Sequence, residues 1–174
     1  MCKHDALPSW SGFNYQGKMT LLCVMIKLNQ ILEGEIVEPD SFWFELEKDE
    51  DFVIYQGALP IGLYQVKARL GDETPGKFGE ACKKLIDNRT RLLQDLGDHT
   101  AICYLVSATN IRNWEKDANH YRDSVKLFKY SRDGEEPTAV GLQEVGACLE
   151  QEILKYISLV GHSHDRSDLL YLRL

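Results

Sequence analysis

The stretch DFVIYQGALPIGLYQVKARL, residues 51–70, decides the fold of this chain. It holds two runs, 51–57 and 61–70, which are rich in the β-branched and aromatic residues typical of strands. Gly57 and Pro60 stand between the runs and predict a turn. Two strands joined by so short a turn must run antiparallel, so this stretch predicts a hairpin.

The segment upstream extends the hairpin to three strands. Residues 40–50 alternate Phe42, Phe44 and Leu46 with Trp43, Glu45 and Glu47, and a period of two is typical of a strand. The spacing from this segment to the end of 61–70 predicts a meander of three antiparallel strands.

Further helices and strands surround the predicted meander. Residues 11–34, 74–97 and 110–123 have helical patterns, and residues 99–109 and 124–131 have strand patterns. The helix 11–34 is apolar nearly all round in its middle, so we expect it to be buried. Residues 99–109 are almost continuously apolar, which is typical of a central strand covered on both faces. The order of elements predicts an α/β fold with a mixed sheet flanked by helices.

Composition limits the class of protein. The chain has 174 residues, of which 44% are hydrophobic and 27% charged, as in a globular domain with a real core. It has no apolar run of 18 residues and no secretory signal pattern, so we expect a cytoplasmic protein without a membrane span. Four of the five cysteines lie in apolar segments and should be buried thiols. The net charge of −7 disfavours unaided coating of nucleic acid, although a local nucleic-acid site remains compatible with it.

A charged segment divides the chain. RDGEEPT, residues 132–138, has the composition of a linker and predicts two parts, 1–136 and 137–174. An amphipathic helix over 139–161 and an uncapped apolar helix in the final SDLLYLRL are expected in the second part. We expect this part to be an assembly segment, either cut within its last helix or docked onto something else.

A cluster of polar residues at the predicted hairpin points to chemistry. Gln65 and Lys67 are two residues apart and share one face of their strand, which we expect to be a solvent-exposed face. Antiparallel pairing would bring Asp51 beside them, with Glu47 and Glu50 just upstream. Carboxylate and amide oxygens are the hard ligands that Mg²⁺ prefers, so Asp51, Gln65 and Glu47 are candidate metal ligands. Lys67 could orient a water molecule or stabilise charge on a phosphate.

These motifs resemble the PD-(D/E)xK nuclease superfamily in its Mrr-like variant, whose motif reads QxK. The opening GFNYQ also resembles the nuclease domains of bacterial anti-phage systems, such as the CD-NTase-associated endonucleases, and the tail is similar to proteins of ABC three-component defence systems. The resemblance covers about residues 11–110. The matching residues are Gly12, Phe13, Tyr15, Gln16, Glu47, Glu50, Asp51, Gln65 and Lys67.

The resemblance implies a restriction-endonuclease-like fold and a DNA endonuclease that uses Mg²⁺ or Mn²⁺. It implies Asp51, Gln65, Lys67 and Glu47 as catalytic residues, double-stranded DNA as substrate, and either a homo-oligomer or a partner ATPase or sensor subunit. Gln65 replaces an acidic residue of the superfamily motif, which removes one negative charge from the metal site. A nuclease-fold module that binds a partner through its C-terminal helices is therefore the alternative, and an RNA-directed enzyme is a third reading.

Overall fold

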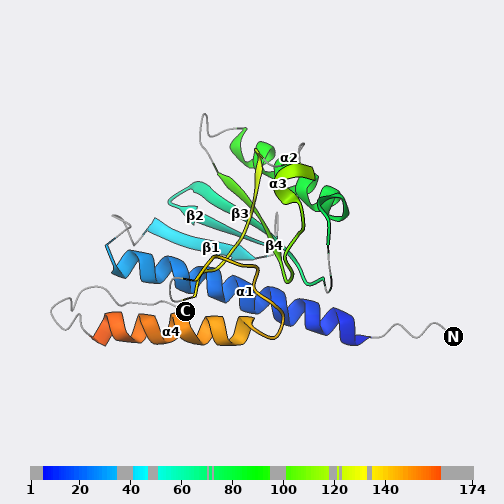
Figure 1. Cartoon of the computed structure of the whole chain (residues 1–174). Coiled ribbons are helices and arrows are strands. Elements are labelled where there is room, and N and C mark those ends of the chain that lie inside the picture. The colour runs from blue at the N-terminus through cyan, green and yellow to red at the C-terminus, as the bar shows by residue number, and fades with distance from the viewer. Residues whose placement is uncertain are drawn as a thin grey trace.

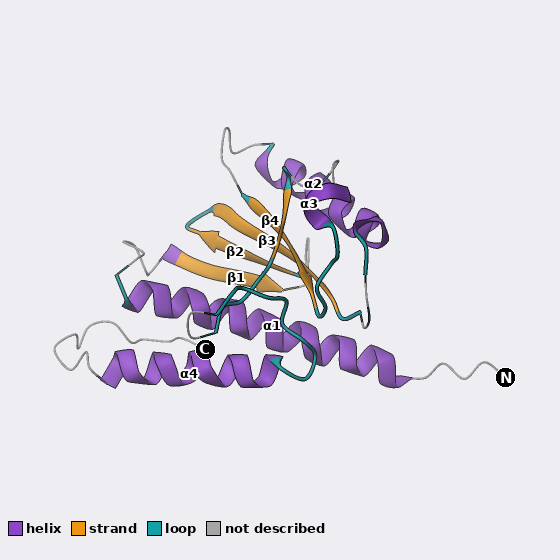
Figure 2. Cartoon of the chain, viewed as in Figure 1, coloured by secondary structure: helices purple, strands orange, loops and turns teal. Residues whose placement is uncertain are grey.

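The structure is a computed structural model of the whole chain, with a sheet between two layers of helices (Figures 1 and 2). It describes residues 6–34, 41–46, 51–69, 71, 73–94, 101–117, 121, 123–132 and 135–161. The long helices α1 and α4 lie side by side under one face of the sheet, and α2 and the short α3 lie over the other (Figure 1). The predicted α/β class, with a mixed sheet flanked by helices and a C-terminal helix, is confirmed.

The strands and helices alternate along the chain after an initial meander. The strands are β1 (Phe42–Leu46), β2 (Phe52–Gln56), β3 (Leu59–Lys67), β4 (Ile102–Ser107) and β5 (Val125–Leu127). The helices are α1 (Ala6–Leu32), the 3₁₀ helix η2 (Pro75–Phe78), α2 (Gly79–Leu93), α3 (Trp114–Asp117) and α4 (Val145–Gly161).

The sheet has the order β1-β2-β3-β4-β5, and its strand pairing changes from antiparallel to parallel at β3. β1, β2 and β3 pair antiparallel, as predicted, whereas β4 pairs parallel with both β3 and β5. Gly57 has a φ of 58°, a left-handed conformation that glycine adopts without strain, and it makes the tight turn between β2 and β3. The two central strands therefore end at the same edge of the sheet, where the candidate site lies.

Alternating side chains of β3 serve two separate cores. Tyr64 and Val66 face α1 and join Tyr15 and Met19 in one buried cluster. Leu63 faces α2 and joins a second buried cluster with Phe78, Cys82, Leu85 and Leu105. Both faces of β3 are covered, because α1 packs on one face of the sheet and α2 on the other.

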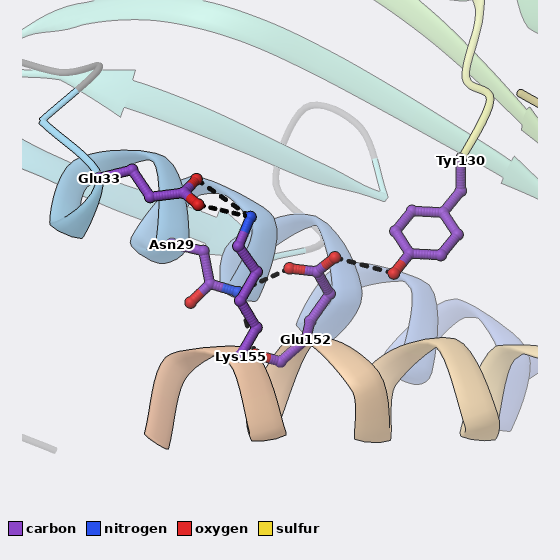
Figure 3. A network of polar contacts seen from close by, with 5 residues as sticks. All are labelled: Asn29, Glu33, Tyr130, Glu152 and Lys155. Carbon is purple, nitrogen blue, oxygen red and sulfur yellow. Dashed lines mark hydrogen bonds and ion pairs between the residues drawn. The ribbon is translucent and has the colours of Figure 1, made fainter. Parts of the chain in front are cut away.

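The first and last described helices are held together by polar contacts (Figure 3). Asn29 on α1 donates to the carboxylate of Glu152 on α4 at 2.6 Å and to its backbone oxygen at 3.0 Å. Tyr130 donates to the other oxygen of the same carboxylate at 2.8 Å. Lys155 pairs with Glu33 at 2.9 Å and 3.0 Å near the helix ends. These contacts fix α4 against α1 at a defined register.

Several predicted elements differ from the structure in their bounds. Of the helix predicted over 110–123, the described residues show the turn α3, which starts only at Trp114 because Asn113 has a φ of 56°, which no α-helix accepts. The helix predicted over 139–161 begins at Val145, after a segment in which Thr138 makes a β-bridge with Tyr130. α1 begins earlier than predicted, at Ala6, and it is not buried all round, because Leu21 is 51% exposed. The final SDLLYLRL lies outside the described residues.

α4 shares a core with the rest of the chain. Val140, Val145 and Cys148 belong to the same buried cluster as Tyr15 and Met19 of α1. The proposed division at 136/137 stays a prediction. The four cysteines predicted to be buried, Cys23, Cys82, Cys103 and Cys148, are buried thiols.

Candidate functional site

The structure brings Asp51 and Gln65 into direct contact. One carboxylate oxygen of Asp51, Oδ2, accepts a hydrogen bond from Nε2 of Gln65 at 2.6 Å. The same oxygen accepts a second bond from the backbone N–H of Val66, also at 2.6 Å. The β2–β3 ladder ends with the pair Phe52–Tyr64, so the carboxylate takes the place of the next backbone acceptor. Asp51 thereby ties the start of β2 to the end of β3.

Lys67 lies at the end of the same strand. Side chains alternate along a strand, so Lys67 lies on the α2 face of the sheet together with Leu63 and Gln65. Lys67 is half-buried, and its carbonyl oxygen accepts from the N–H of Ala108 at 3.2 Å. The predicted trio therefore shares one face at one end of β3.

The expectation of a solvent-exposed face was wrong. Gln65 is only 4% exposed, since β3 lies between β2 and β4 and is covered by α2. A buried amide needs hydrogen-bond partners, and Asp51 supplies one. Gln65 is therefore held in one orientation rather than free in solvent.

Other residues of the predicted motif lie elsewhere. Glu47 and Glu50 lie outside the described residues. Tyr15 and the rest of α1 pack on the opposite face of the sheet from Gln65 and Lys67. The hydroxyl of Tyr15 donates to the carbonyl oxygen of Val140 at 2.7 Å, which gives it a buried structural contact. Tyr15 of the opening motif thus contributes to the core beneath the sheet, whereas Phe13 is 63% exposed.

Two polar residues near this edge were not predicted. Ser107 on β4 is paired in register with Lys67, so their side chains share a face, and Ser107 is 4% exposed. Glu73, after β3, is 5% exposed and forms an ion pair with Lys77 at 3.0 Å. The polar identity of Ser107 at the end of an apolar run was visible in the sequence. The parallel pairing that places it beside Lys67 was not.

The donor atoms fit a divalent cation in part. Within the described part of the chain, Oδ1 of Asp51 and Oε1 of Gln65 accept no hydrogen bond, so two hard oxygens remain available. The described residues contain no group of three or more His, Cys, Asp or Glu side chains that could hold a metal ion. Mg²⁺ commonly keeps several waters and takes only one or two protein carboxylates plus substrate phosphates, so a sparse site of this kind suits it.

Comparisons with known proteins add no assignment. A scan against protein-family models and searches of curated proteins and of solved structures found no match to this chain. Among the residues that the structure describes, no helix is both long and apolar enough to cross a membrane.

Proposed function

We propose that this chain is a divalent-metal-dependent endonuclease domain that hydrolyses DNA phosphodiester bonds in a bacterial defence system. The observation that carries the proposal is the contact between Asp51 and Gln65 on the face of the sheet that also bears Lys67. The motif resemblance to PD-(D/E)xK nucleases in their QxK form supports the same reading. So does the sheet, in which an antiparallel meander is followed by a helix and a parallel strand.

Each residue of the trio would have a distinct role. Asp51 and Gln65 would hold Mg²⁺ or Mn²⁺ through Oδ1 and Oε1, and Glu47 is a further proposed ligand. The ion, when bound, would polarise the phosphate and acidify a water molecule. The ammonium group of Lys67 would stabilise negative charge on the phosphate. The bond from Gln65 to Asp51 would fix the orientation of both oxygen ligands.

A nuclease-fold module that binds a partner is the second candidate. Two observations favour it. Oδ2 of Asp51 already accepts two hydrogen bonds that join β2 to β3, which is a structural role complete in itself. In addition, α4 exposes Ile153, Leu154 and Ile157 at 40%, 59% and 57%, and such a patch fits a second copy or a partner subunit.

Plasmid cleavage with Mg²⁺ or Mn²⁺ separates the two candidates. We expect nicking by the intact chain that rises with added Mn²⁺ and falls steeply with salt, because a chain of net charge −7 binds DNA weakly. Lys67→Ala should reduce the rate by about 100-fold or more, the effect typical of losing one group that stabilises transition-state charge. RNA in place of the plasmid tests the third reading.

Two variants keep the assay interpretable. Asp51→Asn retains an oxygen that can accept from Gln65 and Val66, so it should fold while losing the carboxylate charge that a metal needs. Lys126→Ala removes an exposed lysine from β5 and should cleave at the normal rate. Equal cleavage by wild type, Lys67→Ala and Asp51→Asn would mean a contaminating nuclease. No cleavage of DNA or RNA by any form, including with a copurified partner, would favour the binding module.

A further inference from the structure

A cavity of about 260 Å³ lies on the other face of the sheet, between α1, β3, β4 and the segment after β5. The residues that line it include the aromatic Tyr64, Tyr104 and Phe128 and the polar Lys27, Lys129 and Gln30. Aromatic surface beside two cations is unusual for a gap in a hydrophobic core. It is the composition of a pocket that takes a planar anionic ligand.

The aromatic wall is the end of a stacked row of rings. Phe52 stacks on Tyr64 with ring centroids 4.3 Å apart, and Tyr64 stacks on Tyr104 at 4.8 Å. The ring of Tyr64 lies across Gly62, where an added Cβ would come within 2.8 Å of it. The next position in the sheet, on β5, is Lys126, so no side-chain ring continues the row beyond Tyr104. A ligand ring packed against Tyr104 would extend it.

The polar groups of the cavity have unused hydrogen-bonding capacity. Within the described residues, the hydroxyls of Tyr64 and Tyr104 make no hydrogen bond. Lys27 donates to Oε1 of Gln30 at 3.0 Å, which leaves two of its three N–H donors. Neither Lys27 nor Lys129 has an acidic partner among the residues that the structure describes. Two unpaired cations near one cavity favour an anion there.

We infer that this cavity binds a small aromatic anion of the nucleoside monophosphate class, with the base against Tyr104 and the phosphate between Lys27 and Lys129. The volume restricts the ligand, because it lies just below the usual range of about 300–1,000 Å³ for ligand pockets. The cavity is separate from the candidate nuclease site. Tyr64 and Gln65 are consecutive on β3, so their side chains point to opposite faces of the sheet. Binding there does not require that the chain cleaves nucleic acid.

Titration calorimetry on the intact chain tests the inference. The probes are the four common nucleoside monophosphates, the matching nucleosides, inorganic phosphate, and an aromatic carboxylate. We expect at least one monophosphate to bind with a Kd no weaker than about 1 mM. Its nucleoside and inorganic phosphate should each bind at least about tenfold more weakly, because each lacks one half of the recognition.

Variants locate the binding on the protein. Lys129→Ala removes an exposed lysine and should weaken the monophosphate about tenfold without unfolding the chain. Lys83→Ala removes an exposed lysine from α2, across the sheet, and should bind normally. Tyr104→Leu keeps an apolar side chain but removes the ring, so it should weaken the nucleotide and leave inorganic phosphate unaffected.

Four results would overturn the inference. The first is the absence of binding by every monophosphate at 10 mM, a concentration about tenfold above the weakest expected Kd. The second is equal affinity for monophosphate and inorganic phosphate, which would mean a phosphate site without base stacking. The third is tighter binding of the aromatic carboxylate, which would remove the nucleotide assignment. The fourth is an equal loss of affinity in Lys83→Ala and Lys129→Ala, which would mean general charge attraction.

Discussion

Asn29 and Glu152 are 123 residues apart in the chain, and the amide of Asn29 donates to both the side chain and the backbone of Glu152. Asn29 is only 1% exposed, so its amide depends on the protein for its hydrogen bonds. This pair fixes α4 on α1 with a directional contact that apolar packing alone does not provide.

Asn29→Ala should lower the free energy of unfolding by about 1–3 kcal/mol, because it leaves partly buried polar groups of Glu152 with fewer partners. Urea unfolding followed by circular dichroism measures this. Glu33→Ala, which breaks the exposed ion pair with Lys155 in the same helix interface, should cost no more than about 1 kcal/mol. If the two variants lose equal stability, the Asn29 bonds do not hold the interface.

Leu22→Ala should cost about 2–5 kcal/mol, because Leu22 is fully buried under the sheet and its removal leaves a cavity. Its neighbour Leu21 is 51% exposed, so Leu21→Ala should change stability by less than about 0.5 kcal/mol. Thermal or urea unfolding of both variants checks the orientation of α1. Similar losses at the two positions would contradict the packing described for this helix.

Stability should fall at alkaline pH through the buried thiol of Cys82. Burial raises the pKa of Cys82 to about 11, with a smaller contribution from Cys103. In the unfolded chain a cysteine loses its proton near pH 8.5, so between about 8.5 and 11 only the unfolded state is deprotonated. The contribution of Cys82 to the unfolding free energy should therefore be fully retained below about pH 8.5 and fall by about 1.4 kcal/mol per pH unit between about 8.5 and 11. The slope measured by urea unfolding should be smaller in Cys82→Ala, and an unchanged slope would exclude this thiol as the cause.

The exposed apolar residues of α4 should support self-association. Sedimentation velocity over a range of concentrations should show a dimer or larger species, and Leu154→Glu should shift it to monomer, because a charge cannot be buried unpaired in an apolar contact. Gln151→Glu adds the same charge at an exposed polar position of α4 and should leave association unchanged. A wild-type chain that stays monomeric at high concentration would contradict a self-association surface here.

The meander and the flanking helices could be predicted from the sequence, because periodicity and turn residues are local signals. The pairing of β3 with β4 could not. The parallel pairing of β3 with β4 places Lys67 beside Ser107, although α2 separates the two strands in the sequence. No local sequence pattern predicts such a pairing. For this reason Gln65 was expected in solvent although it lies in an inner strand.

The contact between Asp51 and Gln65 was more accessible to prediction, because a hairpin fixes its own register. The helix at α3 was predicted to begin too early, in a segment whose pattern is polar. A short polar segment gains too little from packing to extend a helix, and the left-handed Asn113 precedes its first turn.

The pairing of α1 with α4 has a consequence for biosynthesis. α1 is made before α4, which packs along it and begins only at Val145. At a translation rate of about 5–20 residues per second, the interval between the two helices is on the order of ten seconds. During that time the side of α1 that packs on α4 has no final cover, although the strands that cover its other apolar side are already made. We expect the nascent chain to depend on chaperone binding at α1 until α4 emerges and completes the interface.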